Sequence, residues 1–335
     1  MKTYHKSIIF TKVPLTRHFR FLDVFQIYPA NLEGLPYSKM QRHFPAIIEY
    51  WTTAEENIAV PDLFEAISDM FTVTARMMNK LDLLLSLLST FSNHLFFRYT
   101  DSTGTWGIPM LKDDPGEEAN TWSSKWNLNL FHSPEFRDQL NISEFSSQSV
   151  PDIKLIDHFP YYMNDPNLDS DYNKEISFPE TIYMDIDSYF KQPVETQAVM
   201  DAAISYSVSA IELRQNKKTL SILAAFTSVE TMVNFEFKDM EVTNCLICGQ
   251  PQFKVSKKYR DYLLKYIGDT SRNKKKFNAY YSLRSKIVHT GQRFKTERLF
   301  NEVTQKEKDE EFLNHLEILQ MSKLAIVQWL LKNRP

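Results

Sequence analysis

Residues 280–291 read YYSLRSKIVHTG, and this stretch decides the fold of the second half of the chain. Leu283, Ile287 and Val288 are apolar at helical spacing. Gly291 can adopt the left-handed backbone conformation that ends many helices. The stretch therefore predicts the last turns of a helix that ends at Gly291.

Two residues of this helix, Arg284 and His289, could act on a phosphodiester. They lie about 140° apart around the helix axis and about 7.5 Å apart along it, so both could reach a groove beside the helix. An arginine carries a permanent charge on a planar fork suited to phosphate, and a histidine exchanges protons near neutral pH. The same two residues also fit a surface arginine and a histidine that stabilises the end of a helix.

The periodicity around this stretch predicts a helical bundle. We expect helices over residues 194–215, 217–235, 256–268, 273–291 and 308–331, with Asn216 and Ser256 as N-caps. The predicted helical domain covers residues 193–335, with the boundary near Pro193.

Residues 1–192 predict an α+β domain that includes an irregular, acidic linker region. Residues 7–10 and 19–27 are rich in β-branched and aromatic side chains, and a helix is expected from Pro61 to Leu88. Residues 95–99 and 105–108 predict a β-hairpin around a turn. The fold class is therefore mainly α, with a helical bundle preceded by an α+β domain.

The spacing Arg284-x4-His289 resembles the R-x4-6-H motif of HEPN domains, and the residues around it look like the Apea-like branch of that family. The resemblance covers roughly residues 193–333. It implies a metal-independent RNA endonuclease in which His289 moves a proton, Arg284 stabilises charge on the phosphate, and a 2′,3′-cyclic phosphate remains. It also implies a bacterial toxin or anti-phage effector, controlled here by an N-terminal domain that senses a regulatory protein or a small-molecule trigger.

The same resemblance implies a homodimer in which two motifs share one cleft. The motif helix would then lie at the two-fold axis, with its tyrosines and Ile287 in the contact. Some HEPN domains do not cleave RNA, so a non-catalytic RNA- or nucleotide-binding module that acts as an interaction subunit is the alternative.

Glu230 is a third candidate for the site because HEPN domains often carry an acidic residue on the corresponding helix. It lies in the apolar stretch 226–233, and a buried carboxylate needs a partner, for which Arg284 is the obvious choice. An exposed glutamate on a polar face is the alternative. Family members frequently have a polar residue, commonly Asn, directly after the arginine; here it is Ser285, which has a shorter side chain.

A basic cluster precedes and overlaps the motif. Residues 193–335 contain 23 Lys and Arg against 16 Asp and Glu, so this part has a net charge of +7 in a chain whose net charge is −3. The candidates for RNA binding are Lys257, Lys258, Arg260, Lys274, Lys275, Lys276 and Lys286. Tyr259, Tyr262, Tyr266, Phe277, Tyr280 and Tyr281 are interleaved with them; they predict either stacking on RNA bases or a tyrosine-rich core.

Cys245 and Cys248 form half of a zinc knuckle, so they could hold a structural zinc ion only with further ligands. They also fit a pair of reduced cysteines in a tight turn, and the family resemblance implies that catalysis needs no cofactor. Two cysteines in 335 residues predict a reducing, cytoplasmic setting. The sequence contains neither a signal-peptide run at its start nor a long apolar run, so no membrane association is expected.

Overall fold

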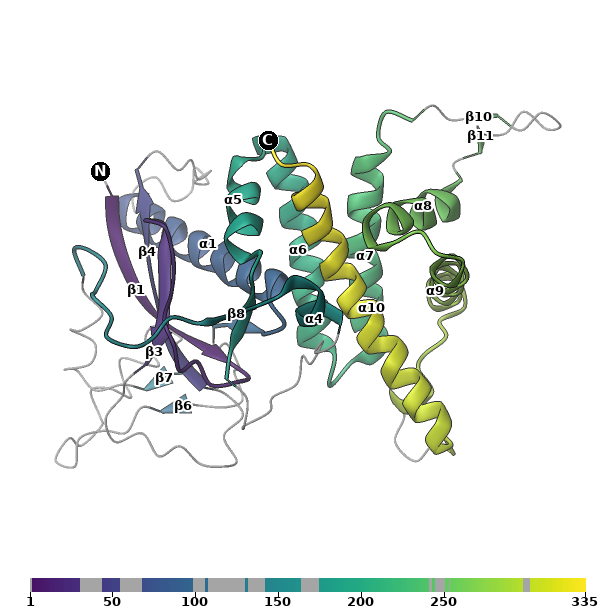
Figure 1. Ribbon diagram of the computed structural model, residues 1–335, viewed down its shortest axis with the longest axis horizontal. Coiled ribbons are helices and arrows are strands. Elements are labelled where there is room, and N and C mark those ends of the chain that lie inside the picture. The colour runs from purple at the N-terminus through teal and green to yellow at the C-terminus, as the bar shows by residue number, and fades with distance from the viewer. Residues whose placement is uncertain are drawn as a thin grey trace. The chain divides into compact units, whose positions relative to one another are not determined.

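The computed structural model describes residues 2–30, 44–54, 68–98, 106–107, 130–131, 142–163, 175–240, 243–244, 251–252, 254–297 and 302–335. The chain forms two compact units, both drawn in Figure 1. The first contains Met1–Leu88, His94–Ile156 and Asn167–Phe178, and the second contains Ser89–Asn93, Asp157–Pro166 and Pro179–Pro335. The described chain is mainly helical with an N-terminal β-sheet, as predicted.

The first unit is built on a five-stranded antiparallel sheet with the strand order β2-β3-β4-β1-β5. Its strands are β1 (Lys2–Thr11), β2 (Phe19–Phe21), β3 (Phe25–Pro29), β4 (Phe44–Thr53) and β5 (Phe96–Phe97). The two long strands, β1 and β4, pair from Lys2↔Thr53 to Thr11↔Phe44 and form the middle of the sheet.

The two faces of this sheet differ in their cover. Helix α1 (Ser68–Phe91) packs against one face, where the hydroxyl of Tyr50 on β4 donates a hydrogen bond to the carbonyl oxygen of Met77, at 3.0 Å. Because successive residues of a strand point to opposite faces, Glu49 belongs to the other face. That second face carries a row of polar side chains.

Two strand predictions in this unit differ from the structure. Residues 19–27 form a hairpin of β2 and β3 that turns at Leu22, where φ is 48°, and not one continuous run. The described parts of the expected hairpin, residues 95–98 and 106–107, do not pair with each other. Instead β5 pairs with β1, and β6 (Trp106–Gly107) pairs in parallel with β7 (Leu130–Phe131). Strand β5 thus pairs with the edge of β1, which is distant from it in the sequence, and not with the nearby segment that the turn signal suggested.

The second unit is a helical bundle centred on α10 (Gln305–Lys332). The other helices are α4 (His158–Met163), α5 (Ile182–Lys191), α6 (Val194–Leu213), α7 (Lys218–Glu236), α8 (Val255–Ile267) and α9 (Ser271–Thr290). Helix α10 contacts α5, α6, α7 and α8, while α8 and α9 contact each other and α7 (Figure 1). None of the described helices is long and apolar enough to cross a membrane.

All five predicted helices are present, but two of the predicted caps are wrong. Helix α7 has Lys217 at its N-cap without a side-chain hydrogen bond, so Asn216 does not cap it. Helix α8 starts after Lys254, which is in the left-handed conformation with φ of 47°, and Ser256 lies inside the helix. Hydrophobic periodicity locates a helix more reliably than it locates the residue at which the chain turns.

The second compact unit begins earlier than the predicted boundary near Pro193. Helix α5 belongs to it because the hydroxyl of Ser188 donates to the carbonyl oxygen of Leu330 on α10, at 3.0 Å. The hydroxyl of Tyr162 on α4 likewise donates to the carbonyl oxygen of Phe91, at 2.6 Å. Three segments that precede Pro193 therefore belong to the second unit: Ser89–Asn93, Asp157–Pro166 and the residues from Pro179 onwards.

Candidate functional site

Helix α9 carries the motif and has defined signals at both ends. At its start the side chain of Thr270 accepts a hydrogen bond from the backbone N–H of Asn273, at 3.0 Å. At its end Gly291 has φ of 66°, and its N–H donates to the carbonyl oxygen of Ile287 at 3.1 Å. The predicted helix end is therefore confirmed, and glycine suits it because other residues are strained at this φ.

Arg284 on α9 is held by Glu230 on α7. Arg284 Nη2 donates to Glu230 Oε2 at 2.9 Å, and Nε lies 2.9 Å from Oε1 in an ionic contact without hydrogen-bond alignment. The two side chains are 24% and 19% exposed, so solvent screens the pair only in part. The predicted partnership of these residues is present, and it fixes the direction of the guanidinium.

A wall of aromatic side chains lies beside this ion pair. Tyr259 on α8 is fully buried, and its ring lies 5.4 Å from that of Tyr281 and 6.3 Å from that of Phe226. Burial, and then the negative charge of Glu230, raise the pKa of the Tyr259 hydroxyl well above its ordinary value. The hydroxyl has no hydrogen-bond partner in the described part of the chain. These apolar surroundings strengthen the attraction between Arg284 and Glu230.

His289 lies in the last turn of the same helix and is exposed. No hydrogen bond or ion pair joins its ring to any other described residue, including Arg284. The five-residue spacing turns it about 140° away from Arg284, so Arg284 faces α7 while His289 points outward. The motif residues therefore share a helix without touching each other.

Five of the seven basic candidates have no ion-pair partner among the described residues. Lys257, Lys274, Lys275 and Lys286 are exposed, and Lys258 is half-buried. On α9, Lys275, Lys286 and His289 fall within about 60° of one another around the axis. A stripe of positive charge therefore runs along one side of α9 towards its histidine.

The other two basic candidates, Arg260 and Lys276, already have partners. The guanidinium of Arg260 lies 3.3 Å from a carboxylate oxygen of Asp261, and Lys276 forms an ion pair with Glu317 on α10. Glu317 also accepts a hydrogen bond from the hydroxyl of Tyr280. Lys276 thus helps to hold α9 against α10, a role that its place in a lysine run does not suggest.

The interleaved aromatic residues belong to the core. Tyr259, Tyr262, Tyr266, Phe277 and Tyr280 are buried, and Tyr281 is half-buried. Of the two interpretations of these side chains, the tyrosine-rich core is the correct one. Ile287 is buried as well, so it cannot form the expected contact between two chains, whereas Val288 is 48% exposed.

Cys245 and Cys248 lie outside the described residues, so the possible zinc site remains a prediction. Among the residues that are described, no group of three or more His, Cys, Asp or Glu side chains is placed to hold a metal ion.

Comparisons of the chain with models of protein families, with curated proteins and with solved structures found no match. The resemblance to HEPN domains therefore rests on Arg284, His289 and the residues around them.

Proposed function

We propose that the second unit is a metal-independent RNA endonuclease of the HEPN type that leaves 2′,3′-cyclic phosphate ends. The observation that carries this proposal is the ion pair between Arg284 and Glu230, on the helix that also presents His289. One residue is held in a fixed direction, and the other is free to meet a substrate.

Arg284 would bind the scissile phosphate with the donors that Glu230 leaves free. A guanidinium has five N–H donors. Glu230 accepts one hydrogen of Nη2 and faces Nε in an ionic contact. The two hydrogens of Nη1 and the second one of Nη2 form the opposite edge of the fork. Because Glu230 fixes this fork in advance, little side-chain entropy is lost when a phosphate binds.

His289 would move a proton during the cleavage. The 2′-oxygen of the ribose forms a bond to phosphorus as the bond from phosphorus to the 5′-oxygen breaks. A neutral imidazole can take the proton of the 2′-hydroxyl, and an imidazolium can donate one to the leaving 5′-oxygen. A single His289 cannot serve as base and acid in the same step, which favours a homodimer with two histidines near one phosphate.

The unpaired lysines would hold the RNA strand. Lys275 and Lys286 lie on the side of α9 that carries His289, and Lys257 and Lys274 add exposed charge near the starts of α8 and α9. Lysines at these places contact phosphates irrespective of sequence, so the affinity for RNA should depend strongly on salt.

The N-terminal unit would control this activity in response to a regulatory protein or a small molecule. A role as a toxin or anti-phage effector is implied by the family resemblance alone, and the cytoplasmic setting is expected from the two cysteines.

A non-catalytic RNA-binding module is the second candidate function. It is favoured by the separation of about 140° between Arg284 and His289, because one phosphate on a single chain cannot easily meet both. The charge of Glu230 also offsets that of Arg284. Neither the separation of Arg284 from His289 nor the charge of Glu230 would prevent the lysines from binding RNA.

A cleavage assay on the full chain tests the proposal. The chain is incubated with a chelator and either RNA or DNA of the same sequence. RNA should be cut to 2′,3′-cyclic phosphate ends and DNA should stay intact, because only RNA has the 2′-hydroxyl. His289→Ala should abolish cutting, and Thr290→Ala, an exposed change in the same turn, should not. Cutting by His289→Ala, or cutting of DNA, would rule out this mechanism. RNA binding without cutting by the wild type would favour the second candidate.

A further inference from the structure

A buried carboxylate lies at the centre of the polar row on the first unit's sheet. Glu49 on β4 is directly opposite Lys6 on β1 and Gln26 on β3, so the three side chains share one face. Glu49 is fully buried. Its Oε1 accepts hydrogen bonds from the hydroxyls of Tyr28 (2.5 Å) and Ser146 (2.6 Å), and its Oε2 accepts from Gln26 Nε2 (2.7 Å) and the backbone N–H of Ser146 (2.8 Å).

These four hydrogen bonds fill the acceptor sites of the Glu49 carboxylate. Burial acts to raise the pKa of Glu49, but the hydrogen bonds from Ser146, Tyr28 and Gln26 outweigh it and leave the pKa lowered. Glu49 is therefore ionised at neutral pH and has no lone pair to offer to a further donor.

Among the described residues, no hydrogen-bond acceptor is found for Lys6. Its Nζ lies 3.7 Å from Glu49 Oε1, which is beyond hydrogen-bond distance, and its side chain is 16% exposed. Within the described chain this ammonium donates no hydrogen bond. Glu49 stabilises the charge of Lys6, yet the three N–H donors of Lys6 are available to another group.

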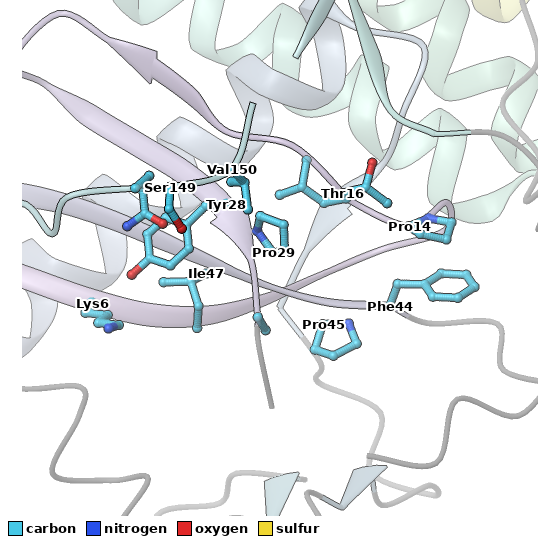
Figure 2. A pocket seen from close by; sticks show the side chains of 13 residues that line it. Lys6, Pro14, Thr16, Tyr28, Pro29, Phe44, Pro45, Ile47, Ser149 and Val150 are labelled. Atoms are coloured by element: carbon cyan, nitrogen blue, oxygen red, sulfur yellow. The ribbon is translucent and has the colours of Figure 1, made fainter. Parts of the chain in front are cut away.

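A pocket of about 800 Å³ opens beside Lys6, between this face of the sheet and residues 148–150. Its two ends differ in character (Figure 2). Lys6, the hydroxyl of Tyr28 and Ser149 lie at one end, while Pro45 and Phe44 lie towards the other. Ile47 forms part of the wall between them. The volume is within the range of about 300–1,000 Å³ found for small-molecule sites.

We propose that this pocket binds a small amphipathic molecule that has an apolar body and one acidic group. The acidic group accepts hydrogen bonds from Lys6 Nζ, and the apolar body lies along Ile47, Pro45 and Phe44. A molecule of the same shape that lacks the acidic group gains only the apolar contacts, because nothing at that position accepts from the ammonium. The site requires neither Arg284 nor His289, so it does not depend on the proposed nuclease activity.

Two fluorescent dyes with the same ring skeleton test the proposal on the full chain. One is 8-anilinonaphthalene-1-sulfonate, which is anionic, and the other is N-phenyl-1-naphthylamine, which lacks the sulfonate. The anionic dye should bind at one site per chain. Lys6→Met should weaken its binding by about tenfold and change that of the neutral dye by less than about twofold.

Lys2→Met is the matched control because Lys2 lies on the same strand and on the same face as Lys6. Its ammonium instead pairs with Asp23 at 2.5 Å and lies 4.2 Å from the centre of the Trp51 ring. This variant should bind both dyes as the wild type does. Val150→Trp, which fills the pocket from its rim, should abolish the binding of both.

If circular dichroism shows that Val150→Trp does not fold, Ser149→Trp replaces it. Ser149 also lines the pocket, and its exposed position tolerates a larger side chain better. The proposal fails if Lys6→Met leaves the affinity for the anionic dye unchanged or weakens both dyes equally. It also fails if a folded filling variant still binds the dyes, or if the wild type binds no anionic dye. None of these results depends on RNA cleavage.

Discussion

Arg284 and Glu230 face each other across α9 and α7 with two N–O distances of 2.9 Å, in a setting where each side chain is less than a quarter exposed. A pair of this kind has two effects. It contributes to the stability of the helical unit, and it fixes the edge of the guanidinium that would meet a phosphate.

Glu230→Gln should separate these two effects. The amide keeps the shape of the carboxylate but not its charge, so we expect a loss of about 1–2 kcal/mol in the free energy of unfolding. RNA binding should be maintained or become stronger because the charge of Arg284 is no longer offset. Cleavage should fall because the fork is less well oriented. Urea unfolding, RNA titration and single-turnover cleavage measure the three quantities.

Glu195→Gln is the control for this change, since Glu195 is an exposed carboxylate on α6 of the same unit. Its stability should stay within about 0.5 kcal/mol of the wild type. If Glu230→Gln cleaves RNA as fast as the wild type, Glu230 does not position Arg284 for the reaction.

The unpaired lysines provide the second prediction. Replacing Lys257, Lys274 and Lys275 by Gln should weaken RNA binding and reduce the salt slope by roughly 0.7 for each phosphate that the variant no longer neutralises. Turnover at saturating RNA should remain, because these residues lie outside the reacting groups. Replacing Lys306 and Lys308, two exposed lysines at the start of α10, is the matched control. An unchanged salt slope in the triple variant would show that this face does not bind RNA.

Local sequence patterns predicted helices α6 to α10 of the second unit because each buries an apolar stripe at the helical period. They missed α4 and α5, which lie in the stretch predicted to be an irregular, acidic linker. They also predicted the end of α9 at Gly291 and the partnership of Glu230 with Arg284. The second prediction was possible because a carboxylate in an apolar stretch requires a partner, and Arg284 was the nearest candidate in the motif. Nothing in the sequence distinguished Lys276, which pairs with Glu317, from the unpaired Lys275 beside it.

Features that depend on distant segments could not be predicted in this way. Strand β5 pairs with β1, which is far from it in the sequence. A turn signal indicates only a local partner, so it could not reveal this pairing. The pocket beside Lys6 combines residues from β1, β3, β4 and residues 148–150. Glu49 was the one available signal, since it interrupts the apolar β4 sequence FPAIIEYWTT, but its donors come from separate strands and from Ser146.

Lys323 supports a prediction about pH. This residue of α10 is fully buried, its ammonium donates to the carbonyl oxygen of Ser92, and burial lowers its pKa to about 7. An unfolded lysine keeps its proton up to about pH 10.4. Between these values the unfolded state binds more protons than the folded state, so the contribution of Lys323 to stability rises with pH.

Lys323→Met should remove this rise and stabilise the helical unit at pH 7. After the lost hydrogen bond to Ser92 is counted, we expect a gain on the order of 2 kcal/mol. Urea unfolding followed by circular dichroism between about pH 7 and about pH 9 measures both effects. Lys308→Met, at an exposed position of the same helix, should leave the pH dependence as it is. Equal pH slopes for Lys323→Met and the wild type would contradict the expectation.

The proposed homodimer gives the last prediction. One chain supplies one His289, whereas cleavage without a metal benefits from a base and an acid acting together. A two-fold interface at the end of α9 would bring a second histidine to the same phosphate. Val288, which is exposed, can contribute to such a contact, while Ile287 and Tyr280 are already buried inside each unit.

We therefore expect the wild type to sediment as a dimer, and an excess of His289→Ala chain to inhibit wild-type cleavage after subunit exchange. A mixture of His289→Ala and Arg284→Ala chains should contain mixed pairs that cleave RNA more slowly than the wild type. An excess of Arg293→Ala chain, changed at an exposed arginine beyond the end of α9, should not inhibit. A fully active monomer, or a His289→Ala chain that exchanges subunits without inhibiting, would show that each chain cleaves RNA by itself.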